Sequence, residues 1–474
     1  MPGFHIEHFG CRAARADGEA IAGHLRALAE RQSLAADVVV VNTCSVTAEA
    51  DRAARAYIRR AHRRNPAARI LVTGCYAQRA PHELAGLPGV AAVVGNSHKA
   101  LVPEIVFGLA QNETPATPPP ALVSVHSLLT ASAPDQNRST AAPIWADDRF
   151  AHSFIEDLRH NEMQLAPGAQ TRPNLKIQEG CSNRCTFCVI PTTRGPSRSL
   201  PHAVVIRRIE AFVASGGKEL VLSGINLGRW GRDLPRELGA PTSLAALVRV
   251  ILKQTALPRL RLSSIEPMDW DDDLIALMHE FGGNRLARHA HLPLQSGSDA
   301  VLRRMHRRYR PWHYADKASA LLRAAGPGLT LGADVMAGFP GETDREFEET
   351  VAFIRSLPFG YLHLFPFSPR PATRAWDLQA ASHVPSAVAD KRMAALRALA
   401  AEKTGAHRIR FIGDDLPAIT LNRPSAFAAV GRTTVLTDNF LPAEIDGNLP
   451  ANQLVRIRVN ALDTEDRLRC HQIA

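Results

Sequence analysis

Short apolar segments alternate with helical patterns six times in the middle of the chain, and this alternation constrains the fold more than any other feature. Six strand–helix units in succession predict an α/β domain whose parallel sheet curls into an open barrel. A closed barrel of eight strands would need two further units, which the sequence does not contain. The last helical pattern opens on Thr343 and Glu346, the two residues of a capping box. The predicted strands begin near Leu175, Glu219, Arg259, His289, Leu329 and Tyr361.

Three cysteines follow the first of these strands. Cys181, Cys185 and Cys188 lie within eight residues, directly after a strand pattern that ends in Gly180. Structural zinc sites use four protein ligands, usually as two pairs, and no fourth Cys or nearby His is present here. Iron–sulfur clusters take Cys thiolates, so three of them would leave one iron of a four-iron cluster open. A three-Cys zinc loop and three buried thiols are the alternatives, and the spacing at a strand end favours the cluster.

A second set of cysteines follows three strands predicted in the first hundred residues. Cys11, Cys44 and Cys75 each stand at the end of one of these strands. The carboxyl ends of parallel strands meet at one edge of a sheet, so we expect the three thiols to converge. Three unrelated thiols are the alternative, because Cys is among the residues most often buried. Cys470 stands alone in the last apolar run, and we expect it to pack in a core.

Composition marks the remaining domain boundaries. Residues 109–172 are rich in Pro, Ala, Ser and Thr, which predicts a linker with a short helix around Ser153–Met163. After a helix predicted over 385–406, short apolar runs broken by turn residues predict a small all-β barrel. The expected division is an N-terminal parallel α/β domain over 1–108, the linker over 109–172, the open barrel over 173–406 and the small barrel over 407–474.

The charge balance suits an anionic partner. The net charge is +10, and arginine, the commoner basic residue, can contact phosphate with two donors. Arg52, Arg55, Arg59 and Arg63 recur at helical spacing, and 302–310 forms a second basic cluster. Each cluster is either a phosphate contact or a solvated helix face. We find no secretory leader and no apolar run long enough for a membrane, and therefore expect a cytoplasmic protein whose thiols bind metal.

The motifs around both cysteine sets resemble those of the radical S-adenosylmethionine (SAM) methylthiotransferases along nearly the whole chain. The first hundred residues carry GCRA, NTCSVT and TGCYAQ, and the middle carries KIQEGCSNRCTFCVIPTTRGPSRS and HLPLQSGSDAVLRRMHRRY. The resemblance implies two [4Fe–4S] clusters, one of which binds SAM at its open iron. It also implies that the C-terminal barrel is similar to the RNA-binding TRAM domain. The implied cluster ligands are Cys181, Cys185 and Cys188 for the first cluster, and Cys11, Cys44 and Cys75 for the second.

The resemblance also suggests where SAM binds. Phe187 occupies a position that is commonly aromatic in this superfamily, and polar groups at the carboxyl ends of barrel strands face the active site. Glycines near the strands would let the backbone approach SAM, although a glycine pair before a strand can also be a helix C-cap. Arg194 and Arg198 either bind an anionic substrate group or are solvated. The implied SAM-binding residues are Phe187, Gly216, Gly217, Ser223, Asn226, Ser264, Glu266 and Gln295.

Three branches of this family differ in substrate: N6-threonylcarbamoyladenosine in tRNA, N6-isopentenyladenosine in tRNA, and an aspartate of a ribosomal protein. The segments NTCSVTAEADRAARAYIRRAHRRNP and LKIQEGC resemble the first branch most. The sequence departs from the family at Ala14, where Asn is usual, and within Ser368–Ala375, which lacks the usual Gly before its Thr.

The implied reaction uses two molecules of SAM per turnover. One is split to a 5′-deoxyadenosyl radical that removes hydrogen from C2 of the modified adenine, and the other methylates the sulfur that is transferred to C2. The implied partners are tRNA, an external electron donor of the flavodoxin or ferredoxin type, and a sulfur source, with no membrane. The competing hypothesis from another class is a non-catalytic iron–sulfur protein that binds RNA or carries electrons. Such a carrier would normally complete its cluster with a fourth Cys.

Overall fold

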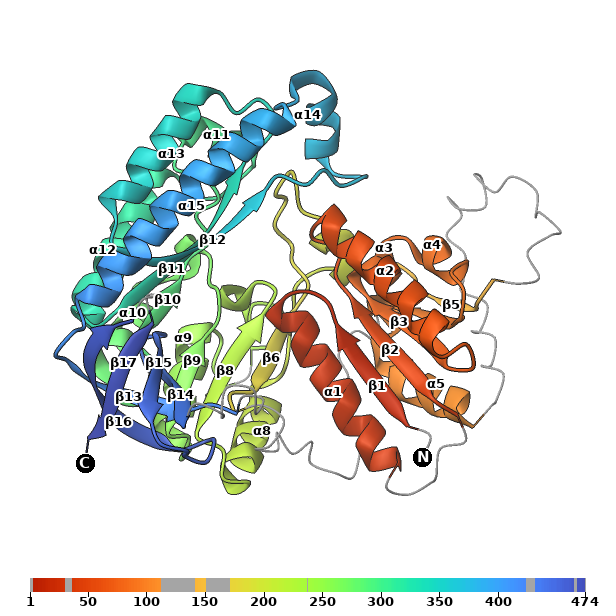
Figure 1. The fold of residues 1–474 in the computed structure, drawn as a ribbon, viewed down its shortest axis with the longest axis horizontal. Helices are drawn as coiled ribbons and strands as arrows, with labels where there is room; N and C mark the ends of the chain where they lie inside the picture. The colour runs from red at the N-terminus through yellow and green to blue at the C-terminus, as the bar shows by residue number, and fades with distance from the viewer. Residues whose placement is uncertain are drawn as a thin grey trace. The chain divides into compact units, whose positions relative to one another are not determined.

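The computed structural model describes residues 3–29, 36–111, 141–150, 171–236, 238–422, 431–463 and 467–473, and Figure 1 traces them. The chain forms two compact units, and each unit is made of several separate stretches of the chain. The first unit contains residues 1–163, 179–183 and 188–196, and the second contains 164–178, 184–187 and 197–474. The segment around the Cys181 loop is therefore divided between the units. None of the helices in the described ranges is long and apolar enough to cross a bilayer.

The first unit is built on a sheet of five parallel strands in sequence order. Its central strands are runs of Val, Ile and Leu that are buried on both faces, as is usual for parallel strands. The predicted strands are confirmed. A fifth strand, Ile144–Trp145, lies inside the segment predicted to be a linker, and the helix predicted over 153–163 lies outside the described residues. The strands are β1 (Phe4–His8), β2 (Val38–Thr43), β3 (Arg69–Gly74), β4 (Val90–Gly95) and β5 (Ile144–Trp145).

Helices cover both faces of this sheet. Helices α1 (Arg12–Ala29) and α5 (Val102–Ala110) pack on one face, where Ile21 and Val106 belong to the same apolar core as Val40. Helix α2 (Ala48–Arg64) and the short helices α3 (Cys75–Arg79) and α4 (Pro81–Ala85) supply the core on the other face.

The second unit contains the six parallel strands predicted from the alternating pattern, and the α/β fold is confirmed. Together with the two-residue strand β7, they form two sheets, β7-β6-β8-β9 and β10-β11-β12. A backbone hydrogen bond of 3.0 Å from Ile265 to His291 links the strand ends across the gap between the sheets. The strands are β6 (Asn174–Glu179), β7 (Arg198–Ser199), β8 (Glu219–Gly224), β9 (Arg259–Leu262), β10 (His289–His291), β11 (Thr330–Ala337) and β12 (Phe359–Pro366).

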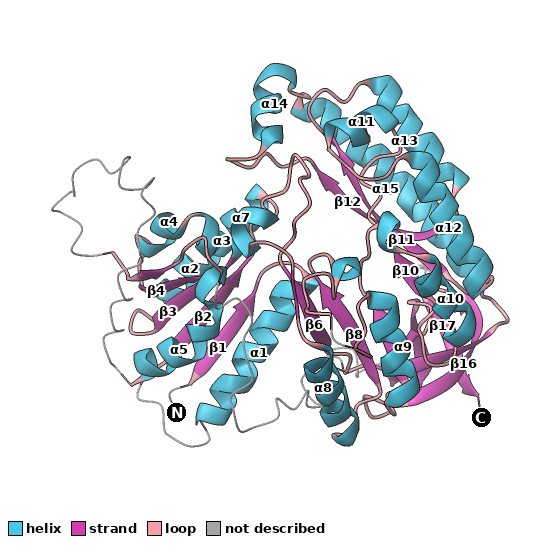
Figure 2. Cartoon of the chain, turned by 180° about the vertical axis from the view of Figure 1, so that it is seen from behind, coloured by secondary structure: helices cyan, strands magenta, loops and turns pink. Residues whose placement is uncertain are grey.

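The helices of the second unit lie around the outside of these strands (Figure 2). They share one large apolar core with the strands. The predicted capping box is present, because Thr343 Oγ1 accepts from the Glu346 backbone and Glu346 accepts from the Thr343 backbone. The helices are α7 (Ile190–Arg194, grouped with the first unit), α8 (His202–Ala214), α9 (Leu244–Gln254), α10 (Asp272–Phe281), α11 (Asp299–Arg304), α12 (Pro311–Ala325), α13 (Asp344–Ser356), α14 (Arg374–Ser382) and α15 (Ser386–Ile409).

The C-terminal segment forms the predicted all-β barrel, which is closed in the order β13-β14-β15-β17-β16. Cys470 is buried in its core as expected, and burial raises the pKa of its thiol to about 12. The strands are β13 (Asp415–Thr420), β14 (Arg432–Thr437), β15 (Pro442–Asp446), β16 (Leu454–Leu462) and β17 (Leu468–Ile473).

The turn after β14 holds this barrel against the amino ends of the six strands. Asp438 accepts two hydrogen bonds from Arg288, of 2.7 and 3.1 Å. Phe440 stacks on His289 with ring centroids 4.4 Å apart. The carbonyl of Thr437 accepts a hydrogen bond of 3.1 Å from the buried side chain of Arg261. The closed barrel is therefore part of the second unit.

We predict that Gly74→Ala damages the sheet edge that carries the first cysteine set. Gly74 has φ +99°, and a Cβ there would lie 2.3 Å from the carbonyl oxygen of Thr43, next to Cys44. Left-handed φ alone costs about 1–2 kcal/mol in a residue with a side chain, and the clash is with backbone. We expect the free energy of opening of β2 and β3, measured by amide hydrogen exchange, to fall by at least about 2 kcal/mol.

Gly216→Ala is the matched control for this substitution. Gly216 has φ +86° but open space around its Cβ position, so only the conformational cost of about 1–2 kcal/mol applies. Equal iron content in the two reconstituted variants would contradict the link between Gly74 and the cysteine edge.

Candidate functional site

The structure brings Cys11, Cys44 and Cys75 together at the carboxyl edge of the sheet of the first unit. Cys44 directly follows β2, Cys75 directly follows β3, and Cys11 lies in the turn after β1. Gly10 packs so closely that a Cβ on it would lie 3.0 Å from the Cys44 Sγ. Burial, together with the nearby Cys75 and Cys11, raises the pKa of the Cys44 thiol to about 12. Three converging thiols are a donor set that fits an iron–sulfur cluster.

Arg194 is the side chain that contacts this cysteine set most directly. Its Nε lies 3.2 Å from the Cys75 Sγ, while its Nη1 lies 2.7 Å from Glu179 and 3.2 Å from Asp17. The side chain is fully buried. Both roles expected for Arg194, as a contact to an anionic substrate group or as a solvated side chain, are therefore wrong. Asn96 adds a second donor to the Cys75 Sγ at 3.4 Å.

A second buried cation completes this network. Lys99 Nζ lies 2.6 Å from Asp17 and 3.4 Å from Glu179. Buried charges are tolerated when they are paired and hydrogen-bonded, and here two cations face two carboxylates. Burial alone would lower the pKa of Arg194, but Cys75, Glu179 and Asp17 raise it well above its ordinary value. The network thus keeps a positive charge at the sulfur of Cys75.

The loop of the other cysteine set is held within each unit by its own contacts. In the first unit, the Cys181 amide donates to the Gly195 carbonyl at 3.0 Å. Gly180 has φ +69°, and a Cβ there would lie 2.0 Å from the Pro196 carbonyl oxygen, so only glycine fits. The seven cysteines, all described, are free thiols without disulfides.

In the second unit, Cys185 is positioned by a buried ion pair. Arg307 Nη1 donates to the Cys185 Sγ at 3.3 Å, and its Nη2 lies 2.7 Å from both carboxylate oxygens of Glu266. Thr186 is fixed by backbone and side-chain hydrogen bonds to the carbonyls of Met305 and Arg304. Glu266 was expected to contact SAM; in the structure its carboxylate holds the arginine that contacts Cys185.

Several predicted SAM-binding residues lie at the carboxyl ends of the strands, as expected. Ser223 is the second-last residue of β8, and Gln295 follows β10 with a strained φ of +62°. The Ser223 Oγ and the Gln295 Oε1 are buried without a hydrogen-bond partner among the described residues. Buried polar atoms are normally satisfied, so these two atoms fit a polar ligand at this edge. Asn226 follows β8, Ser264 follows β9, and Phe187 packs edge-on against Phe339.

The glycine pair expected to approach SAM lies at the wrong end of its strand. Gly216 and Gly217 precede β8, and their amides donate to the carbonyls of Val213 and Phe212. They therefore terminate α8, which was the alternative interpretation. The Gly216 carbonyl also accepts from the Asn452 side chain of the closed barrel. This position gives no reason to place either glycine at the SAM site.

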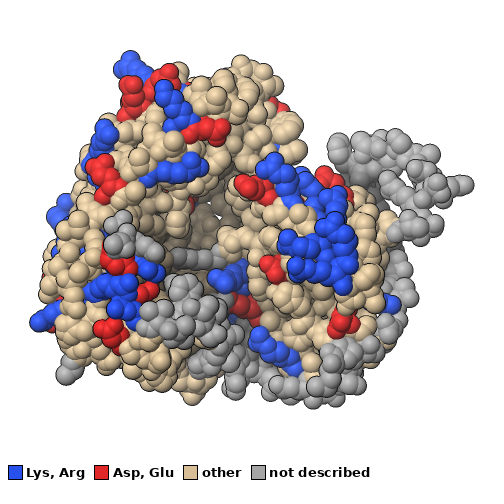
Figure 3. All heavy atoms as spheres, in the orientation of Figure 1, with Lys and Arg blue, Asp and Glu red and all other residues tan. Residues whose placement is uncertain are grey.

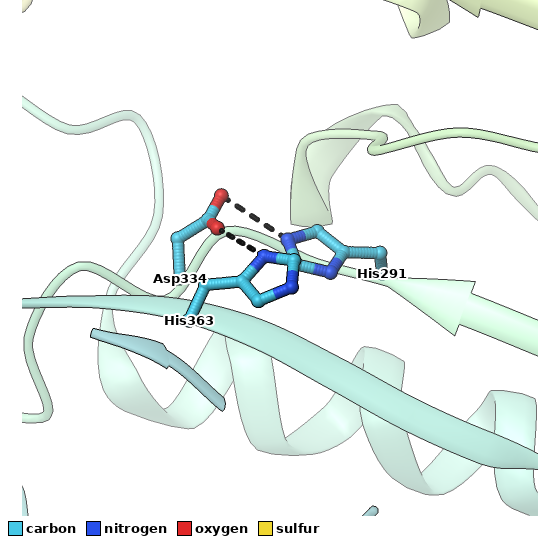
Figure 4. Close-up of side chains that lie close together, drawn as sticks. All are labelled: His291, Asp334 and His363. Carbon is cyan, nitrogen blue, oxygen red and sulfur yellow. Dashed lines mark ion pairs between the residues drawn. The ribbon is translucent and has the colours of Figure 1, made fainter. Parts of the chain in front are cut away.

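A group of polar side chains that sequence reasoning did not connect comes from β10, β11 and β12, and its members point toward one another (Figure 4). His291 Nε2 lies 3.1 Å from Asp334, and His363 Nδ1 lies 3.3 Å from the other oxygen of the same carboxylate. Burial alone would raise the pKa of Asp334, but hydrogen bonds from His291 and His363 hold it well below its usual range.

Comparison with known proteins identifies the family. Residues 3–95 match the uncharacterized protein family UPF0004, and residues 175–354 match the radical SAM superfamily. A protein of Bacillus subtilis named threonylcarbamoyladenosine tRNA methylthiotransferase MtaB is 37% identical over 379 residues, which are 78% of this chain and 74% of the relative. The chain belongs to the radical SAM methylthiotransferases.

Other relatives extend this match. A protein of the same name from Rickettsia prowazekii is 30% identical over 98% of this chain and 96% of its own length. A protein of Novosphingobium aromaticivorans named tRNA-2-methylthio-N(6)-dimethylallyladenosine synthase is 34% identical over 83% of this chain and 81% of its own length. As a member of this family, the chain uses [4Fe–4S] clusters and SAM.

We predict that Arg194→Gln lowers the reduction potential of the cluster at the Cys75 site. A buried cation beside a cluster favours its reduced, more negative state, so its removal favours the oxidised state. An interaction of about 1.4 kcal/mol corresponds to a shift of about 60 mV for one electron. The potential is measured by redox titration in a background carrying Cys181→Ala, Cys185→Ala and Cys188→Ala, so that one cluster remains.

Arg194→Lys keeps the charge while losing the branched contact, and it is the control. We expect its potential to stay closer to that of the unsubstituted protein. Equal shifts in the Gln and Lys variants would show that contact geometry, and not charge, sets the potential.

Proposed function

We propose that this chain methylthiolates C2 of N6-threonylcarbamoyladenosine next to the anticodon of tRNA. The observation that carries the proposal is the convergence of Cys11, Cys44 and Cys75 at one sheet edge, in a chain that also has an open three-cysteine loop. A protein that only transfers electrons would normally complete each cluster with a fourth Cys. The relatives named for threonylcarbamoyladenosine, which match up to 99% of this chain, support the choice of branch.

The protein contributes position and electrostatics to this reaction. When bound, the clusters and two molecules of SAM supply the 5′-deoxyadenosyl radical, the methyl group and the sulfur. Arg307, which is held by Glu266, orients Cys185 and neutralises part of its thiolate charge. Arg194 does the same for Cys75. The unpaired oxygens of Ser223 and Gln295 provide hydrogen-bonding partners for SAM at the carboxyl edge of the barrel.

The basic face of α2 is suited to bind the tRNA backbone. Four arginines recur on one face of this helix, within about a quarter of its circumference at 3.6 residues per turn. Thr47 caps the helix, and Ala54 and Ile58 turn inward to the core. Figure 3 shows the resulting cluster of basic side chains on the surface of the first unit. The arginines are Arg52, Arg59 and Arg63, which are exposed, and Arg55, which is half-buried.

The closed barrel is the other RNA contact that we propose, because of its similarity to the TRAM domain. Removing it whole would be a poor test. Such a truncation would leave Arg288 without its partner Asp438 and expose His289 where Phe440 now covers it. We also propose a cytoplasmic location, an external electron donor of the flavodoxin or ferredoxin type, and an external sulfur source.

We predict that the two cysteine sets fail differently in a strain lacking this gene and complemented with variants. Replacing Cys181, Cys185 and Cys188 with Ala should abolish both the release of 5′-deoxyadenosine and the methylthio nucleoside. Replacing Cys11, Cys44 and Cys75 should abolish the nucleoside but preserve 5′-deoxyadenosine release in the purified protein. Each variant should keep about half of the iron, since a four-iron cluster is expected at each site.

Mass spectrometry of tRNA nucleosides decides the substrate in the same strains. Loss of the methylthio form of threonylcarbamoyladenosine is the expected result. Loss of the isopentenyl form instead would move the protein to the other tRNA branch. Product formed without Cys11, Cys44 and Cys75 would refute the role of the second cluster.

We predict that Arg52→Glu, Arg59→Glu and Arg63→Glu together weaken tRNA binding. Each lost phosphate contact lowers the slope of log K against log salt by about 0.7–0.9, so the slope should fall by about 2–3. The control carries Arg207→Glu, Arg323→Glu and Arg345→Glu, three exposed arginines of the second unit that change net charge equally. Equal losses of slope in both triple variants would show that net charge alone governs binding.

A further inference from the structure

The cluster of His291, Asp334 and His363 has the composition and spacing of a metal site. Its ligand atoms all lie within 4.8 Å of one another. Two ligands that each lie about 2.1 Å from one ion, at the angles of a tetrahedron or octahedron, are about 3.0–3.4 Å apart. The observed separations of 3.1 and 3.3 Å match that spacing.

The strands fix this arrangement. Asp334 and His363 are direct partners in the register of β11 and β12, and His291 is the last residue of β10. Side chains that face the same side of neighbouring strands are held a few ångströms apart by the pairing itself. The three groups therefore need no loop to bring them together.

A supporting side chain holds His291 from behind. The Tyr361 hydroxyl lies 2.9 Å from His291 Nδ1 and 2.8 Å from His289 Nε2. Room for its ring comes from Gly332, where a Cβ would lie 2.2 Å from the ring. Histidine ligands of metals characteristically make such a hydrogen bond through the other ring nitrogen, which directs the free nitrogen at the ion.

The hydrogen bonds around Tyr361 bear on the charge between His291 and Asp334. The hydroxyl has one proton to donate. When it donates to His289, it accepts from His291 Nδ1, and the His291 Nε2 lone pair then faces the Asp334 carboxylate. Two acceptors 3.1 Å apart repel each other, so either a proton on His291 Nε2 or a metal ion must lie between them.

We propose that His291 Nε2, the Asp334 carboxylate and His363 Nδ1 bind one divalent transition-metal ion. Two imidazoles and one carboxylate suit Zn²⁺ or Fe²⁺ better than the all-oxygen sites of Mg²⁺ or Ca²⁺. The His291 side chain is 6% exposed and the His363 side chain is 56% exposed. The ion is thus closed off on the side of Tyr361 and open on the side of His363, where water or another oxygen ligand completes its shell.

The test uses the full-length protein with both clusters reconstituted, so that the cysteines are occupied, and Zn²⁺ alone as the probe. After equilibration and gel filtration, zinc and iron are measured together by mass spectrometry. We expect about one zinc ion per chain, as for one ion at one three-ligand site. Asp334→Asn and His363→Ala should lower the affinity at least tenfold with unchanged iron. His383→Ala, at an exposed histidine outside the cluster, should bind zinc normally.

A further variant separates a metal site from a hydrogen-bonded group. Tyr361→Phe keeps the ring and all three ligands but loses the hydroxyl, and loss of such a supporting bond costs about 10–100-fold in metal affinity. X-ray absorption at the zinc edge should show nitrogen and oxygen ligands. Sulfur ligation, or equal zinc uptake by the unsubstituted protein, Asp334→Asn and His363→Ala, would overturn the proposal whatever the outcome of the nucleoside assay.

Discussion

The contact between Arg194 and Cys75 is the interaction on which the arrangement of the first unit depends. Arg194 comes from the segment that follows the Cys181 loop, whereas Cys75 ends a strand 119 residues earlier. A buried guanidinium beside a thiol needs further anions, and Asp17 and Glu179 supply them. Lys99 then balances those carboxylates. Breaking any member leaves an uncompensated buried charge, which typically costs about 3–5 kcal/mol. The network therefore fixes the edge where three cysteines meet, and it ties the segment after one cysteine set to the other set.

Local patterns in the sequence were sufficient to predict most of the fold. The six barrel strands, the four longer strands of the first unit and the closed barrel all follow from apolar runs and turn residues. The convergence of Cys11, Cys44 and Cys75 followed from strand order alone. The strand at Ile144–Trp145 was missed because two residues within a stretch rich in Pro and Ala carry no periodicity. Gly216 and Gly217 were placed at the SAM site because a glycine pair beside a strand does not reveal which end of the sheet it occupies.

The long-range ion pairs could not be predicted from local sequence patterns. Arg307 stands in a basic run that was expected to be surface, yet it is buried between Glu266 and Cys185. Its spacing to Glu266 is 41 residues, and only the closing of the barrel brings the two together. Arg194 is a similar case. In both cases, a cation that contacts a cysteine sulfur is paired with a carboxylate that no local sequence pattern connects to it.

The two ends of the six-stranded barrel carry different kinds of polar group, and this difference separates chemistry from assembly. At the amino ends, the charges are paired within the protein: Arg261 with Glu219, and Arg288 with Asp438 of the closed barrel. At the carboxyl ends, Ser223 and Gln295 keep buried oxygens that have no hydrogen-bond partner among the described residues. A polar atom that pays the cost of burial without a partner needs a ligand to satisfy it. The oxygens of Ser223 and Gln295 therefore suit a polar ligand at the carboxyl ends, whereas the stacking of Phe440 on His289 covers part of the opposite side.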